Sequence, residues 1–169
     1  MTDELNIKIS VGTDVASWFL FHPDDLAYRR HDPLTWWTED FAIAKEFAAG
    51  RLIAVRTGKD GNTNVRFTNQ GLTEREQTYA RKSAEFRLRV QQGCLYLDGG
   101  WAVPSAEQID PEECYRTSYG WLTLPNGDYR ATVHALAWFE EPDSMNEQGY
   151  STPQALATFV VDIQPVKNL

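Results

Sequence analysis

Apolar and polar residues alternate in several short stretches of the chain, and this period of two is typical of β-strands with one buried face. Glycine-rich or proline-containing stretches separate them and set the ends of the predicted strands. The stretches that we expect to be strands are residues 5–11, 18–21, 52–55, 65–67, 84–90, 94–97, 121–124, 129–139 and 157–163.

One segment follows the helical period instead. Residues 38–49 are predicted to form a helix, with Thr38 as the N-cap and Gly50 as the left-handed residue that ends it. Its apolar residues recur on one stripe, as expected for a helix that packs on a sheet. The residues of this stripe are Trp37, Phe41, Ala44 and Ala48, widened by Ile43 and Phe47. Thr73 and Glu76 have the spacing of a capping box, which predicts a second, brief helix through about Lys82.

Two glycine-containing turns indicate hairpins. Asn126-Gly127 suits a type I′ turn, so residues 121–124 and 129–139 are predicted to pair as its arms. The stretch Gly58–Asn62 (GKDGN) is predicted to return residues 65–67 antiparallel to residues 52–55.

Together these elements predict a mostly β, α+β fold: an antiparallel β-sandwich or open barrel with one or two helices packed on it. The chain has 169 residues, of which 42% are hydrophobic, enough to bury the core of one domain. We therefore expect residues 1–169 to form a single globular domain, and its oligomeric state stays open.

Negative charge is concentrated in the C-terminal half. Residues 1–90 hold 13 Lys and Arg against 13 Asp and Glu, whereas residues 91–169 hold 3 against 11. An acidic surface attracts basic partners and repels nucleic acid. The sequence therefore suggests a non-enzymatic interaction domain of the inhibitor or immunity type, which binds a basic protein such as a nuclease or toxin. The carboxylates expected to contact this partner are Asp110, Glu112, Glu113, Glu140, Glu141 and Asp143.

Two other interpretations of the charges stay open. The acidic residues fit two unconnected solvated loops, and their excess fits a role in solubility alone. A local basic set resembles a nucleic-acid surface, but neighbouring glutamates balance it and the net charge of −8 opposes phosphate binding. The basic residues are Arg75, Arg81, Lys82, Arg87 and Arg89. We expect no nucleic-acid partner.

Trp101, Trp121 and Trp138 support an alternative function, a small-molecule pocket lined by tryptophan. No catalytic, phosphate-binding or metal motif is recognisable, so we expect no cofactor and no metal. A hydrolase built on His22, Asp24 and Asp25 would require these three residues to converge in space.

The N-terminus carries neither a signal peptide nor a membrane-spanning run, which predicts a cytoplasmic protein without a membrane partner. In that compartment Cys94 and Cys114 are expected to be reduced.

Two stretches are similar to a known family. Residues 32–61, with Trp37-Thr38-Glu39 before the helix and a strand after it, and the later stretch containing Gly127 and Tyr129 resemble the competence protein J type of bacterial nuclease inhibitor. This resemblance covers about a quarter of the chain. It implies a small cytoplasmic protein that blocks a nuclease, and the five matched positions look structural rather than inhibitory.

Overall fold

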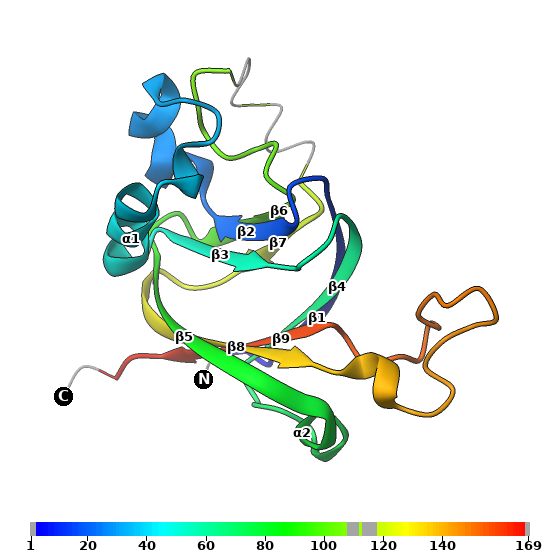
Figure 1. The fold of residues 1–169 in the computed structure, drawn as a ribbon. Coiled ribbons are helices and arrows are strands. Elements are labelled where there is room, and N and C mark those ends of the chain that lie inside the picture. Colours follow the sequence, from blue (N-terminus) through cyan, green and yellow to red (C-terminus); the bar gives the residue numbers. More distant parts are fainter. Residues whose placement is uncertain (1–2, 108–111, 113–117, 168–169) are drawn as a thin grey trace.

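Two β-sheets pack face to face in the computed structural model, which describes residues 3–107, 112 and 118–167 (Figure 1). One sheet has five strands in the order β1 (Asn6–Thr13), β4 (Gly61–Thr68), β9 (Phe159–Pro165), β8 (Gly127–Leu136) and β5 (Ala80–Val90). The other has four, in the order β3 (Leu52–Arg56), β2 (Ser17–Phe21), β6 (Cys94–Asp98) and β7 (Gly120–Thr123). All nine expected strands are present, and the predicted sandwich is confirmed.

Helices occupy one face of the small sheet and one end of the large one (Figure 1). The α-helices are α1 (Asp40–Ala49) and α2 (Glu74–Tyr79), and the 3₁₀ helices are η1 (Pro23–His31), η2 (Trp36–Thr38) and η3 (Trp138–Glu140). None of the described helices has the length and apolar character needed to cross a lipid bilayer.

The main core lies between the inner faces of the sheets. Alternation along each strand directs one set of side chains inward, as in Leu88 and Val90 of β5. Trp18 of β2 is fully buried and meets Phe159 of β9 edge to face, with ring centroids 5.8 Å apart. The strand pairs are antiparallel except for β4 and β9, which run parallel, so the large sheet is mixed.

The hairpin predicted at Asn126-Gly127 is wrong. The strand β7 pairs with β6, whereas β8 pairs with β5 and β9 in the opposite sheet. Neither Asn126 nor Gly127 has the positive φ that a type I′ turn requires. Instead, the Asn126 side chain accepts a hydrogen bond from the backbone of Gly93 at 2.8 Å, and the chain crosses between layers. Both strands carry core-facing apolar residues. These side chains can enter the core from opposite sheets as readily as from one sheet.

The hairpin predicted across Gly58–Asn62 is also wrong. The strand β3 pairs with β2, and β4 pairs with β1 and β9. Asp60 accepts a hydrogen bond at 2.9 Å from the backbone of Ala16, in the turn between β1 and β2. This contact directs the linker to a neighbouring turn, and Val65 and Phe67 then enter the core from the large sheet.

The helix α1 ends as predicted but exposes a different face. Gly50 adopts a φ of 72° and closes the helix. Thr38 lies in η2 instead of capping α1, whose N-cap is Glu39. Phe41 is 86% exposed, and the helix packs through Ile43 and Phe47 beside the fully buried Glu46. The buried face is therefore rotated away from the predicted stripe, and it contains a charged residue that the prediction did not include.

The predicted capping box begins α2. Thr73 and Glu76 exchange side-chain to backbone hydrogen bonds of 2.8 and 3.2 Å. Arg66 of β4 holds the same glutamate with two hydrogen bonds of 2.6 and 2.5 Å. The helix ends at Tyr79 rather than near Lys82, since β5 starts at Ala80 and pairs with β8 from there.

Candidate interaction surfaces

The connection from β8 to β9 protrudes from the body of the molecule (Figure 1). We call residues 138–154 the projecting segment; coloured orange in Figure 1, it extends away from both sheets. Its tip is ordered by Asn146, whose side-chain oxygen accepts hydrogen bonds from the backbone of Gln148 at 3.0 Å and of Tyr150 at 2.9 Å. An antiparallel bridge between Met145 and Ser151 closes this turn.

Two arginines fix the base of the projecting segment. Arg75 of α2 makes a bidentate ion pair with Glu141 at 2.5 and 2.6 Å and also donates to the carbonyl of Gln154 at 2.7 Å. Arg81 of β5 pairs with Glu140. The Arg75 guanidinium lowers the pKa of Glu141 below its ordinary value. Two of the predicted partner-binding carboxylates are thus neutralised within this chain, so the segment is less negative than its sequence suggests.

Apart from these two ion pairs, the projecting segment keeps acidic and apolar groups in solvent. Asp143 and Glu147 are exposed, and within the described residues neither is paired with a cation. Phe139 is 54% exposed, and Tyr150 is 71% exposed. Residues 138–154 contain no lysine or arginine. This combination of exposed aromatic rings and carboxylates is suited to contact with another macromolecule.

The other predicted acidic loop is described only in part. Glu112 is exposed, whereas Asp110 and Glu113 lie outside the described residues. That these three carboxylates and those of the projecting segment contact one partner stays a prediction. Cys94 is half-buried at the start of β6, and Cys114 also lies outside the described part of the chain.

The three tryptophans of the alternative pocket lie in different environments. Trp101 is 65% exposed in the loop after β6, and Trp138 is half-buried against Phe139. Trp121 is 61% exposed and lines an open groove of about 710 Å³, which we call the end groove. Neither Trp101 nor Trp138 lines this groove, so the structure does not bring the three together there.

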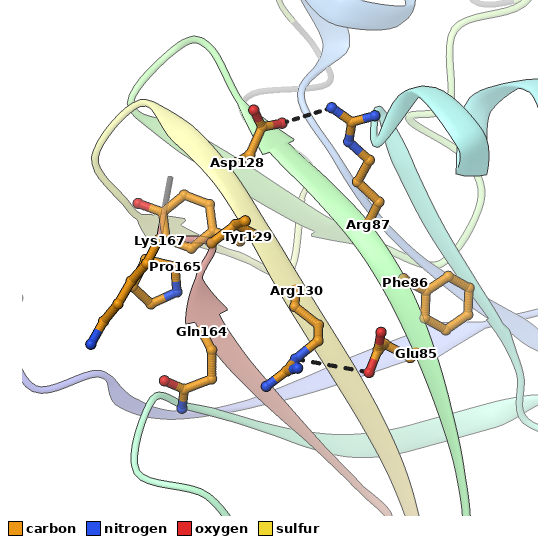
Figure 2. A pocket seen from close by; sticks show the side chains of 10 residues that line it. Glu85, Phe86, Arg87, Asp128, Tyr129, Arg130, Gln164, Pro165 and Lys167 are labelled. Atoms are coloured by element: carbon orange, nitrogen blue, oxygen red, sulfur yellow. Dashed lines mark hydrogen bonds and ion pairs between the residues drawn. The ribbon is translucent and has the colours of Figure 1, made fainter. Parts of the chain in front are cut away.

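A second groove of about 710 Å³ lies on the large sheet where β5, β8 and β9 meet. Arg87 and Arg130 are direct register partners across β5 and β8, an unfavourable arrangement for like charges. Figure 2 shows that each points to a carboxylate on the neighbouring strand, Arg87 to Asp128 at 3.3 Å and Arg130 to Glu85 at 3.8 Å. Hydrogen bonds from Arg89 and Arg87 lower the pKa of Asp128. Arg87 and Arg89 of β5 therefore belong to a set of neighbouring opposite charges on this sheet.

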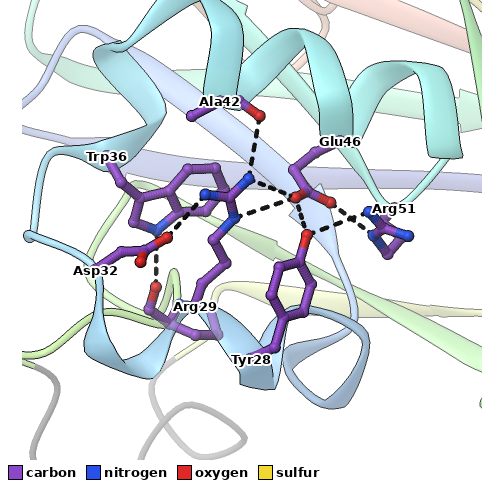
Figure 3. A network of polar contacts seen from close by, with 8 residues as sticks. Tyr28, Arg29, Asp32, Trp36, Ala42, Glu46 and Arg51 are labelled. Carbon is purple, nitrogen blue, oxygen red and sulfur yellow. Dashed lines mark hydrogen bonds and ion pairs between the residues drawn. The ribbon is translucent and has the colours of Figure 1, made fainter.

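A polar network between η1 and α1 was missed by the sequence reasoning (Figure 3). Glu46 is fully buried and accepts hydrogen bonds from Arg29 at 3.1 and 2.8 Å, from Arg51 at 2.6 Å and from the hydroxyl of Tyr28. The Arg29 guanidinium also lies over the ring of Trp36, 4.4 Å from its centroid. Burial alone would raise the pKa of Glu46, but these donors outweigh it and hold the pKa below its ordinary value. Glu46 lies outside the predicted apolar stripe, so the apolar pattern gave no sign of its burial.

His22, one residue of the hydrolase alternative, has a local structural role. His22 is buried and caps η1, because its ring nitrogen accepts a hydrogen bond from the backbone of Asp24 at 3.2 Å. Burial lowers the pKa of His22. Among the described residues, no group of three or more His, Cys, Asp or Glu side chains is arranged to hold a metal ion.

The sequence matches one protein family over most of its length. The chain belongs to a family of unknown function (DUF6386), whose profile matches residues 5–137. No curated protein sequence matches it.

Two solved structures share the fold over nearly their whole length. The protein described as crocagin biosynthetic gene J is 17% identical, with a TM-score of 0.57 and 99% of both chains covered. ComJ from Bacillus subtilis, an inhibitor of the DNA-degrading activity of NucA, is 16% identical, with a TM-score of 0.55, 98% of this chain covered and 99% of its own. The predicted resemblance to the competence protein J type is thus confirmed at the level of the fold. Of its matched positions, Trp37 is half-buried and Tyr129 is buried.

Proposed function

We propose that this protein is a non-enzymatic binding protein of the inhibitor type, and that its partner is a basic protein such as a nuclease or toxin. The shared fold with ComJ supports an inhibitor in particular, because ComJ blocks the DNA-degrading activity of another protein. A fold alone does not fix a function, so the proposal depends on a surface of this chain.

The projecting segment is that surface, and its exposed aromatic and unpaired acidic groups carry the proposal. Exposed aromatic side chains supply the apolar contact area that protein interfaces favour, here from Phe139 and Tyr150. Asp143 and Glu147 supply negative charge that steers and orients a basic partner. Glu140 and Glu141 have a different role in this proposal, because their pairs with Arg81 and Arg75 hold the segment in place.

The test is capture of basic proteins by the immobilised chain at low and high salt, followed by an assay of nuclease or toxin activity of what is captured. Reversal of the two outer charges, Asp143→Lys with Glu147→Lys, should weaken capture by at least about tenfold, as should added salt. The matched control is Asp14→Lys with Glu39→Lys, which reverses two exposed carboxylates elsewhere. Capture that resists salt, or that both double variants weaken equally, would contradict the proposal.

A further inference from the structure

The end groove lies at the opposite end of β8 from the projecting segment. It is lined by Leu124 and Tyr129, which flank the start of β8 at Gly127, whereas the projecting segment follows the end of this strand at Leu136. Ten residues of extended strand span roughly 30 Å. A ligand in the end groove would therefore occupy a site separate from the proposed partner surface.

The walls of the end groove continue into the main core. Leu5, Leu124 and Ile163 line it, and all three belong to the core between the sheets. At the rim, Ile7 is 39% exposed and Trp121 is 61% exposed. The groove is thus an apolar opening at one end of the sandwich, where ligand sites of β-folds commonly lie.

Among the described residues that line the end groove, the charged ones are all acidic. Asp3 and Glu4 are the charged residues among those that line it, and both are exposed. The backbone that carries them is clamped by Asn69, which accepts a hydrogen bond from the backbone of Leu5 and donates one to the carbonyl of Asp3, each at 3.0 Å. The backbone segment that carries the two carboxylates is therefore fixed at a groove with apolar walls and an aromatic ring.

We propose that the end groove binds a small organic cation, an ammonium group carried on an apolar or aromatic body. The carboxylates of Asp3 and Glu4 attract the charge, the Trp121 ring offers a face for a cation–π contact, and the apolar walls bury the body of the ligand. The volume of about 710 Å³ lies within the range of small-molecule sites. This site is independent of the proposed inhibitor function.

Three probes with similar bodies and different charges test the proposal: phenethylamine, 2-phenylethanol and 3-phenylpropanoate. Their binding is measured by calorimetry, and their location by amide shifts of Gly93 and Asn69 in ¹H–¹⁵N spectra. The amine should bind at least about tenfold more tightly than the alcohol, and the acid most weakly. Equal binding of all three, no binding of the amine, or shifts confined to other residues would overturn the proposal.

Two double variants isolate the charges. Asp3→Asn with Glu4→Gln should remove most of the preference for the amine, whereas Asp14→Asn with Glu39→Gln, which neutralises two exposed carboxylates outside the groove, should leave it unchanged. A preference that survives the first variant would contradict the role of these carboxylates. Asp143→Lys with Glu147→Lys should leave amine binding intact, so failure of this proposal and failure of the inhibitor proposal are separable.

Discussion

The buried carboxylate of Glu46 accepts two hydrogen bonds from the guanidinium of Arg29, at 3.1 and 2.8 Å. Its second oxygen accepts from Arg51 at 2.6 Å. One carboxylate of α1 thus joins η1 to the residue that precedes β3. Because the buried face of the helix contains this charge, the position of α1 on the molecule depends on these two arginines.

Removal of this carboxylate should destabilise the fold strongly. Glu46→Ala leaves Arg29 with a side chain only 10% exposed and without its main partner, and breaking such a buried pair costs about 3–5 kcal/mol. The free energy of unfolding in urea measures the effect. Glu39→Ala is the control, because Glu39 is exposed and makes no capping hydrogen bond, so its change should stay within about 0.5 kcal/mol. Similar values for the two variants would show that the network does not stabilise the protein.

The same carboxylate should contribute to acid sensitivity. The pKa values of Glu46 and Glu76 are lowered in the folded protein, because hydrogen bonds from arginines and, for Glu76, from Thr73 outweigh the effect of burial. As the pH falls, the two glutamates therefore take up protons in the unfolded chain before they do so in the folded protein. Their contribution to the free energy of unfolding is complete above about pH 4.5 and is lost as the pH falls through the folded pKa values.

Unfolding free energies from neutral pH to about pH 3 check this dependence. The double variant Glu46→Gln with Glu76→Gln should have a lower stability at neutral pH and a flatter decline below about pH 4.5. The buried His22 also lowers the free energy of unfolding on acidification, because burial lowers its pKa. Both proteins contain His22, so its contribution cancels when their curves are compared. Parallel curves for the two proteins would exclude the two glutamates as the cause.

Gly99 should tolerate no side chain. A Cβ at this position would lie 1.9 Å from the backbone oxygen of Gly12, so Gly99→Ala forces two backbone segments apart and should cost about 1–3 kcal/mol. At Gly127 the nearest atom to a new Cβ is 3.7 Å away, which makes Gly127→Ala the matched control, with a change within about 0.5 kcal/mol. Thermal unfolding of both variants distinguishes them, and an unchanged Gly99→Ala would show that the close approach is not required.

The pair of Arg75 and Glu141 should stabilise the projecting segment modestly. Because the Arg75 side chain is 51% exposed, a double-mutant cycle with alanine should give a coupling of about 0.2–1 kcal/mol that decreases with salt. Hydrogen exchange of the segment should accelerate in Glu141→Ala but not in Glu147→Ala, since only Glu141 contacts α2. Equal exchange in the two variants would contradict an anchoring role.

Features encoded by local pattern could be predicted from the sequence. Alternation placed Leu88 and Val90 in the core, Gly50 ended α1, and Thr73 with Glu76 began α2, because each depends on residues a few positions apart. The turn at Asn126-Gly127 was also a local signal, but the sheet that each strand joins depends on distant partners. Strand β8 pairs with β5 and β9, and β7 with β6.

Features that depend on distant pairing could not be predicted. Glu46 is buried because Arg29, 17 residues earlier, compensates its charge. The pairing of Glu141 and Glu140 was missed for the same reason, since Arg75 and Arg81 lie 66 and 59 residues before them. A count of charges along the chain cannot show which of them already meet an opposite charge.

The strand β9 lies between β4 and β8, with a parallel neighbour on one side and an antiparallel neighbour on the other. During translation it is made after every other strand, so the large sheet lacks an interior member until Pro165 has left the ribosome. Until then β4 and β8 present unpaired backbone edges to other chains, which is the hazard that leads to aggregation. A nascent chain stalled before Phe159 is therefore expected to need a chaperone.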